Sequence, residues 1–91
     1  MFVVELRPVA ARSLHRLLRP SVAGAVIELL SGPLSADPYA IGKPLRGAFE
    51  GLRVVRRGEY RVIYLIDGKR RRVDVLRIEH RRDAYRRMDG D

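Results

Sequence analysis

The sequence lacks cysteine altogether, and it contains no hydrophobic run long enough to cross a bilayer. Without cysteine the chain can form neither a disulfide framework nor a thiolate metal site, which is typical of a reducing cytoplasm. The apolar run Val22–Leu30 is interrupted by Gly24 and Glu28 and is far shorter than the roughly 20 residues that a membrane helix needs. The chain begins with the strand-like residues Phe2–Leu6 instead of the basic and then apolar segment of a signal peptide. We therefore expect a cytoplasmic protein with no membrane contact.

The sequence also lacks the patterns that mark several large classes of enzyme. It has no pair of carboxylates at metal-ligand spacing, no His-x-x-x-His, and no glycine-rich loop of the kind that binds phosphate. It has no serine or cysteine nucleophile with a basic partner. We therefore expect neither a metal ion nor a cofactor.

Acidic residues are few, and the resulting positive charge is unevenly distributed. The chain has 19 basic and 11 acidic residues, a net charge of +8. Residues 46–91 contain fourteen of the basic and eight of the acidic residues. Such an imbalance is typical of a protein that binds nucleic acid or an acidic partner. All but two of the basic residues are arginine, which suits phosphate recognition. A GC-rich genome produces the same bias, and for the surface arginines we give both explanations equal weight.

The length of 91 residues predicts a single domain covering residues 1–91. Its first half predicts a strand followed by two helices. The strand is Phe2–Arg7, and Pro8 ends it and opens the first helix. Pro20 ends that helix and opens the second, which stops at Gly32-Pro33. Both helices have an apolar stripe, so we expect an αα-hairpin packed on a sheet.

The second half predicts an antiparallel meander of three strands. Residues Gly58–Ile66 are rich in β-branched and aromatic side chains, and we expect this strand to pair with Leu52–Arg57 and with Arg71–His80. Asp67-Gly68 predicts a tight turn in which both residues have positive φ. The fold class is therefore α+β, with a sheet of about four strands. Residues 34–51 have no clear periodicity, and we expect them to be anchored by Ile41, Leu45, Phe49 and Leu52.

Several side chains suited to phosphodiester chemistry gather in this meander. Pairing about Gly58 places Arg56 and Arg61 on neighbouring strands, and the last strand brings His80, Arg81 and Tyr85 alongside. Guanidinium groups bind phosphate oxygens, an aromatic ring stacks on a base, and an imidazole transfers protons near neutral pH. The nearby acids are expected to pair with arginines rather than with Mg²⁺; they are Glu59, Glu79 and Asp83.

Four motifs in combination resemble the RelE branch of the RelE/ParE toxin superfamily. They are Gly42-Lys43-Pro44-Leu45, Gly51-Leu52, Arg57-Gly58-Glu59-Tyr60-Arg61-Val62-Ile63-Tyr64 and His80-Arg81-Arg82-Asp83-Ala84-Tyr85-Arg86. The resemblance covers nearly the whole chain, including the strand–helix–helix opening. It implies the RelE-like, microbial ribonuclease-type fold and the toxin of a toxin–antitoxin pair. Such toxins enter the ribosomal A site and cut mRNA by in-line attack of a 2′-hydroxyl, without a metal.

The resemblance also implies which residues form the site. By position, Arg61, Arg81 and Tyr85 match the family's catalytic cleft best, followed by Arg56, with His80 as a further catalytic residue. The cations that we expect to bind RNA are Arg53, Arg57, Lys43, Arg46 and Arg82.

The general base is left open by the sequence. Some family members carry a lysine pair near the positions of Arg53 and Val55, and one of those lysines is proposed to take the 2′-hydroxyl proton. Arginine stays protonated and is a poor base. Either His80 takes the proton, or bending and clamping the message supplies the rate. The alternative role for His80 is that of a strand-end histidine bonded to a backbone carbonyl.

Two other functions compete with mRNA cleavage. One is the gyrase-inhibiting ParE branch of the same superfamily, which performs no chemistry of its own, and the other is a plain RNA- or DNA-binding module. The net charge and the resemblance also predict a protein partner, an acidic RelB-like antitoxin whose amphipathic segment wraps the toxin. The other expected partners are mRNA and the ribosomal A site.

Overall fold

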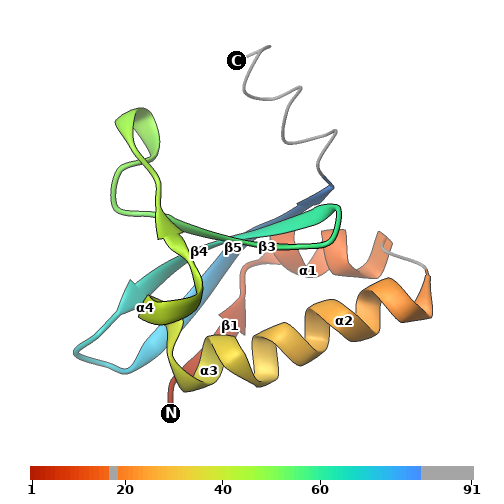
Figure 1. The fold of residues 1–91 in the computed structure, drawn as a ribbon, viewed down its shortest axis with the longest axis horizontal. Helices are drawn as coiled ribbons and strands as arrows, with labels where there is room; N and C mark the ends of the chain where they lie inside the picture. Colours follow the sequence, from red (N-terminus) through yellow and green to blue (C-terminus); the bar gives the residue numbers. More distant parts are fainter. Residues whose placement is uncertain (17–18, 81–91) are drawn as a thin grey trace.

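The structure of the protein is a computed structural model, which describes residues 1–16 and 19–80 (Figure 1). It is an α+β fold in which helices pack on one face of a twisted sheet. The elements in chain order are β1 (Val3–Leu6), α1 (Pro8–Arg16), α2 (Pro20–Ser31), α3 (Pro33–Ala36), α4 (Pro38–Ile41), β2 (Lys43–Pro44), the 3₁₀ turn η1 (Gly47–Phe49), β3 (Arg53–Arg57), β4 (Tyr60–Asp67) and β5 (Arg72–His80).

The two long helices begin at prolines, as the sequence predicts. Pro8 and Pro20 stand at the first helical positions of α1 and α2, where a missing N–H costs nothing. Helix α2 ends at Gly32, whose N–H donates to the carbonyl of Glu28 at 2.9 Å. The residues by which α1 and α2 enter the core are Ala10, Val26, Leu29 and Leu30.

The sheet has five strands in the order β1-β5-β4-β3-β2, so the prediction of about four strands was one too low. The additional strand is β2, in which Lys43 and Pro44 pair with Val54 and Arg53. Two residues with a proline among them carry no strand signal, and only the neighbouring strand makes them extended. Strand β1 runs parallel to β5, and the other pairs are antiparallel. The predicted central position of the strand after Gly58 is confirmed.

The two hairpin turns differ from each other, and one differs from its prediction. Arg57 pairs with Tyr60 around a two-residue turn that begins at Gly58, whose φ is +61°. The predicted tight turn at Asp67-Gly68 was wrong, because Asp67 pairs with Arg72 and the loop spans residues 68–71. The Asp67 carboxylate accepts a hydrogen bond from the N–H of Arg70 at 3.1 Å, and the positive φ falls on Arg71 at 50°. The carboxylate thus closes a longer loop than the dipeptide predicts.

The segment without periodicity, residues 34–51, contains two four-residue helices and a 3₁₀ turn. Asp37 caps α4 by accepting hydrogen bonds from the N–H groups of Tyr39 and Ala40, both at 3.2 Å. Ile41 packs against the core as predicted. The anchoring role predicted for Phe49 was wrong, because its side chain is 50% exposed. This residue lies in a loop that projects from the sheet on the side away from α2 (Figure 1).

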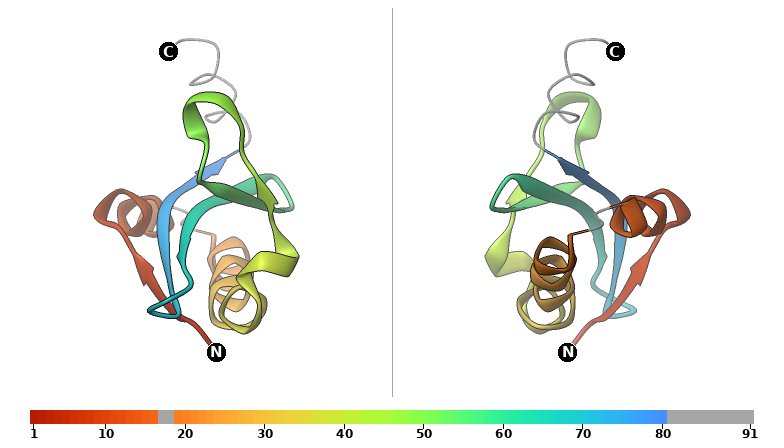
Figure 2. Two further views of the ribbon diagram at one scale, coloured as in Figure 1. Left: turned by 90° about the vertical axis from the view of Figure 1, so that its left-hand side faces the viewer. Right: turned by 90° about the vertical axis from the view of Figure 1, so that its right-hand side faces the viewer.

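The core lies between the sheet and the helices, which share one side of the sheet (Figure 2). Val55, Val62 and Tyr64 point into this core together with residues of α2. Because side chains alternate along a strand, the residues between them point to the opposite face of the sheet. We call these two surfaces the helix side and the open face. Within residues 1–16 and 19–80, no helix is long and apolar enough to span a membrane.

Candidate functional site

A row of charged side chains crosses three strands on the open face. Arg56 on β3 lies opposite Arg61 on β4, and Arg61 lies opposite Glu79 on β5. Arg77, two residues before Glu79, points to the same face. We call these four residues the arginine row. The sequence analysis had predicted that Arg56 and Arg61 are neighbours, and the pairing confirms it.

Glu79 holds two of the arginines at once. Its Oε1 lies 3.5 Å from Nη2 of Arg61, and its Oε2 lies 3.6 Å from Nη1 of Arg77. The Glu79 side chain is 7% exposed and that of Arg61 is 16% exposed, so this ion pair is largely removed from water. Burying a guanidinium is costly unless an anion compensates it. The expected pairing of Glu79 with an arginine is confirmed, and it explains how Arg61 is tolerated in the middle of a strand.

Arg56 differs from Arg61 in exposure and pairing. It is exposed, and no ion pair joins it to another of the described residues. Two cations directly opposite each other on neighbouring strands repel. An anion placed between them, such as a phosphate, would relieve this repulsion, and guanidinium groups bind phosphate oxygens through paired N–H donors. The open face therefore presents two opposed guanidiniums whose repulsion a bound anion would relieve.

A second row lies on the helix side, behind the first. Arg57 lies opposite Tyr60, and Tyr60 lies opposite His80, so these side chains point away from the open face. The rings of Tyr60 and His80 meet edge to face with centroids 5.0 Å apart. Nε2 of His80 lies 3.5 Å from Oε2 of Glu59, so Glu59 contacts a histidine where an arginine was expected. The structure thus does not bring Arg57 and His80 together with Arg61.

Arg53, predicted to bind RNA, contacts the chain itself. Its Nη2 donates to the carbonyl of Tyr39 at 2.7 Å and to that of Gly42 at 2.9 Å. Next to it, the buried hydroxyl of Tyr64 donates to the carbonyl of Pro38 at 2.7 Å. Burial raises the pKa of Tyr64, while the neighbouring Arg53 opposes this shift. Tyr64 is a fully buried core residue. Together these bonds fasten α4 and the start of β2 to the sheet.

Of the other predicted site residues, some are exposed on the surface and the rest lie outside the residues that the structure describes. Lys43 on β2 and Arg46 before η1 are exposed, as predicted, and are available to a ligand. Arg81, Arg82 and Tyr85 lie outside the described residues, and so does Asp83. Sequence reasoning missed Arg77. The signal that would have found it is the alternation Arg77–Ile78–Glu79, which places two opposite charges on one side of a strand.

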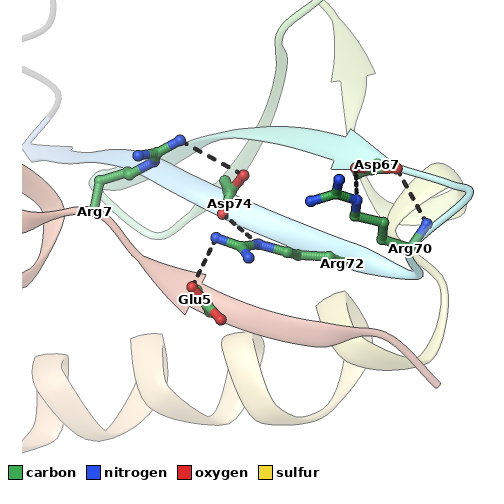
Figure 3. Close-up of polar contacts among 6 residues, drawn as sticks. All are labelled: Glu5, Arg7, Asp67, Arg70, Arg72 and Asp74. Carbon is green, nitrogen blue, oxygen red and sulfur yellow. Dashed lines mark hydrogen bonds and ion pairs between the residues drawn. The ribbon is translucent and has the colours of Figure 1, made fainter.

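The open face also carries a second polar network, at the β1–β5 end (Figure 3). Arg72 lies 2.8 Å from Glu5 and 3.0 Å from Asp74, and Arg7 lies 3.8 Å from Asp74. The hydrogen bond to Asp74 raises the pKa of Arg72 further. These arginines are compensated by carboxylates and join the two parallel strands. Among the described residues of the arginine row, Arg56 is the one that no ion pair joins to a carboxylate.

Glu79→Gln is expected to lower the free energy of unfolding by about 2 kcal/mol, because the carboxylate charge that Arg61 and Arg77 share is lost. Urea denaturation measures this. The matched control is Glu50→Gln, an exposed residue beside η1, which is expected to change stability by less than about 0.5 kcal/mol. Equal effects of the two substitutions would contradict the role of Glu79 as the shared anion.

Comparison with known proteins places this architecture in a family. A family model described as the ParE toxin of the type II toxin–antitoxin system parDE matches residues 4–85. The chain belongs to this toxin family. Toxin RelG of Mycobacterium tuberculosis is 43% identical over 86 residues, covering 94% of this chain and 98% of the relative. Toxin RelE of the same organism is 45% identical over 83 residues, covering 91% and 84%.

Solved structures agree with these relatives. A chain of the toxin–antitoxin complex RelBE2 from M. tuberculosis matches this toxin with a TM-score of 0.83 at 41% identity, over 88% of this chain and 98% of that one. The isolated RelE toxin of E. coli has a TM-score of 0.72 at 17% identity, over 97% and 99% of the two chains, and shares the fold. The toxin is therefore of the RelE type, as the motifs predicted.

Proposed function

We propose that this toxin is an endoribonuclease that acts in the cytoplasm and cuts mRNA in the ribosomal A site without a metal, thereby inhibiting translation. The observation that carries the proposal is the pair of opposed guanidiniums, Arg56 and Arg61, on an open sheet face. The names of the relatives RelE and RelG favour this branch over the gyrase-inhibiting one. Arg81 and Tyr85 remain predicted members of the site from the motif alone.

In the proposed reaction, the 2′-hydroxyl oxygen attacks the adjacent phosphorus and the bond from phosphorus to the 5′-oxygen breaks. The 2′-hydroxyl loses its proton, the leaving oxygen gains one, and the products are a 2′,3′-cyclic phosphate and a 5′-hydroxyl. Negative charge grows on the non-bridging oxygens as the new bond forms. Arg61 is held in place by Glu79, so its donors stabilise that charge without first having to be oriented.

The position of His80 bears on the general base. Its ring packs on Tyr60 on the helix side, while Arg61 points to the open face. A base must lie within about 3 Å of the proton that it removes, or reach it through one water. We therefore propose that holding the RNA in the in-line geometry supplies most of the rate, an effect that can be worth several kcal/mol. His80→Ala is then expected to reduce cleavage less than substitution of Arg61.

Primer extension on cellular mRNA after brief expression tests the proposed reaction. Cuts at defined codon positions are the expected result. Intact mRNA together with arrested DNA supercoiling would instead identify a gyrase inhibitor. Intact mRNA with normal supercoiling would contradict both mRNA cleavage and gyrase inhibition. It would leave the protein as a nucleic-acid-binding module.

We also propose that an acidic, RelB-like antitoxin neutralises this toxin. The net charge of +8 and the similarity to a chain of the RelBE2 toxin–antitoxin complex support this. Attraction between a basic toxin and an acidic partner speeds association and is screened by salt. The association rate is expected to fall by at least tenfold between about 50 and 500 mM salt, measured by stopped-flow fluorescence. A rate that does not change with salt would contradict an electrostatic mechanism of recognition.

A further inference from the structure

A trough runs along α2 and β3, and most of its lining residues have no part in the proposed cleavage reaction. Three adjoining hollows of about 390, 240 and 300 Å³ lie along α2 and β3, and Arg57 lines all three. We call this set of hollows the Arg57 trough. About half of its other lining residues are aliphatic, including Val22, Ala25 and Leu29 of α2, and Ile41 and Val54.

Arg57 is the distinctive charge of this trough. It is exposed, and no ion pair joins it to another described residue. Its guanidinium therefore stands beside aliphatic side chains and offers an uncompensated positive charge there. An incoming carboxylate would pair with it while apolar neighbours cover the aliphatic wall. Pairs that become desolvated in this way contribute strongly to the affinity of protein complexes.

The lining of the trough fits a polypeptide better than RNA. Glu28 and Glu59 also line it, so the trough offers no continuous row of cations for the regularly spaced phosphates of a nucleic acid. RNA also has no aliphatic groups to bury against α2. A second copy of this chain fits poorly as well, because each copy carries a net charge of +8. A polypeptide segment with apolar and acidic residues would cover the aliphatic wall of the trough and pair with Arg57.

The edge of the sheet next to the trough is uncovered. Strand β2 pairs only with Arg53 and Val54, so residues 55–57 of β3 have no strand on that side among the described residues. The hollow of about 390 Å³ lies along this part of β3, and Lys43 lines it with Arg56 and Arg57. Main-chain groups at a free edge can bond an extended segment. The basic side chains there favour an acidic one.

We propose that the Arg57 trough docks the acidic, apolar-containing segment of the antitoxin. This inference rests on the proposed function only in taking an antitoxin to be the partner. Arg57 lines all three hollows, whereas Arg56 of the arginine row borders only the hollow of about 390 Å³. The antitoxin can then hold the toxin largely through residues that the proposed cleavage reaction does not require.

Two charge reversals of exposed arginines test the assignment. The affinity of purified toxin for its co-expressed antitoxin is measured by isothermal titration calorimetry for Arg57→Glu, in the trough, and for Arg12→Glu, on α1 and outside the trough. Arg57→Glu is expected to weaken binding at least 30-fold, and Arg12→Glu less than threefold. Equal losses of affinity for the two variants would overturn the proposal, and so would two unchanged affinities.

A second pair of variants guards against a local effect at the hairpin. Ala25→Glu adds an acidic side chain to the wall of the trough, and Ala11→Glu adds one to the exposed surface of α1. Only Ala25→Glu is expected to weaken antitoxin binding, by at least tenfold. Equal affinities of these two variants would overturn the proposal. Cleavage of mRNA by the same proteins reports on the proposed reaction alone, so a toxin that cuts no mRNA but shows this pattern would refute the reaction and support the trough.

Discussion

Arg61→Ala is expected to lower the rate of mRNA cleavage on ribosomes by a factor of about 10²–10³, the usual effect of removing one preorganised donor from a developing negative charge. Arg61 is the residue of the arginine row that is both largely buried and held by an anion, so its donors are fixed before RNA arrives. Single-turnover cleavage with saturating ribosomes measures the effect. Arg12→Ala, which removes an exposed arginine on α1, is expected to leave the rate unchanged.

Loss of folding must be separated from loss of chemistry in this experiment, because Arg61→Ala also leaves Glu79 with one arginine fewer. Replacing both members of a buried pair costs less than replacing one. The double variant Arg61→Ala, Glu79→Gln is therefore expected to recover stability in urea without recovering cleavage. Cleavage at the parental rate by either variant in its folded state would refute the role of Arg61.

Gly42→Ala is expected to destabilise the fold by about 3 kcal/mol, at the upper end of the usual cost of overpacking. A Cβ at position 42 would overlap the hydroxyl oxygen of Tyr64 and would lie 2.9 Å from the carbonyl oxygen of Val54. Neither atom can move freely, because the hydroxyl is hydrogen-bonded to Pro38 and the carbonyl belongs to β3. Urea denaturation followed by circular dichroism measures the change.

The same clash predicts a rescue. Tyr64→Phe removes the hydroxyl and its hydrogen bond to Pro38, at a cost of about 1 kcal/mol on its own. In the double variant with Gly42→Ala the overlap is relieved. The double variant is therefore expected to lose at least 1 kcal/mol less free energy of unfolding than the sum of the losses of the two single variants. Gly24→Ala is the control, because nothing lies within 4 Å of a Cβ there. In the middle of α2 it is expected to stabilise by about 0.5–1 kcal/mol. Simple additivity of Gly42→Ala and Tyr64→Phe would contradict this account of the clash.

The division of arginines between the two faces changes how the basic charge of this toxin is understood. From the sequence, Arg53, Arg56, Arg57 and Arg61 were all expected to belong to one cleft. In the structure, Arg56 and Arg61 point to the open face, Arg57 borders the trough, and Arg53 binds carbonyl groups of the chain. Because side chains alternate along a strand, Arg56 and Arg61 lie on one face of the sheet and Arg53 and Arg57 on the other. Arg53 differs from Arg57 in that it is hydrogen-bonded to the chain itself.

Local signals were sufficient wherever the cause was local. Prolines fixed the starts of α1 and α2, since their φ suits a first helical turn and their missing N–H ends what precedes it. Gly58 predicted a turn that places Arg56 and Arg61 on neighbouring strands, and the two residues pair in the structure. The Asp67 loop was mispredicted because its length is set by a side-chain hydrogen bond to Arg70, which the dipeptide does not reveal. Phe49 was misplaced because hydrophobicity alone does not say whether a loop residue reaches the core.

By itself the sequence determined the order of the elements, the hairpin that aligns Arg56 with Arg61, and, through its motifs, the RelE-type family. Only the tertiary structure decided what lies opposite Arg61. The pairing of β4 with β5 shifts by one residue between Ile63 and Tyr64, and this bulge places Glu79 opposite Arg61 where an unbroken register would place Ile78. A shift of one residue moves every side chain beyond it to the other face of a sheet. No local pattern records that shift, because it arises from how two strands pack together.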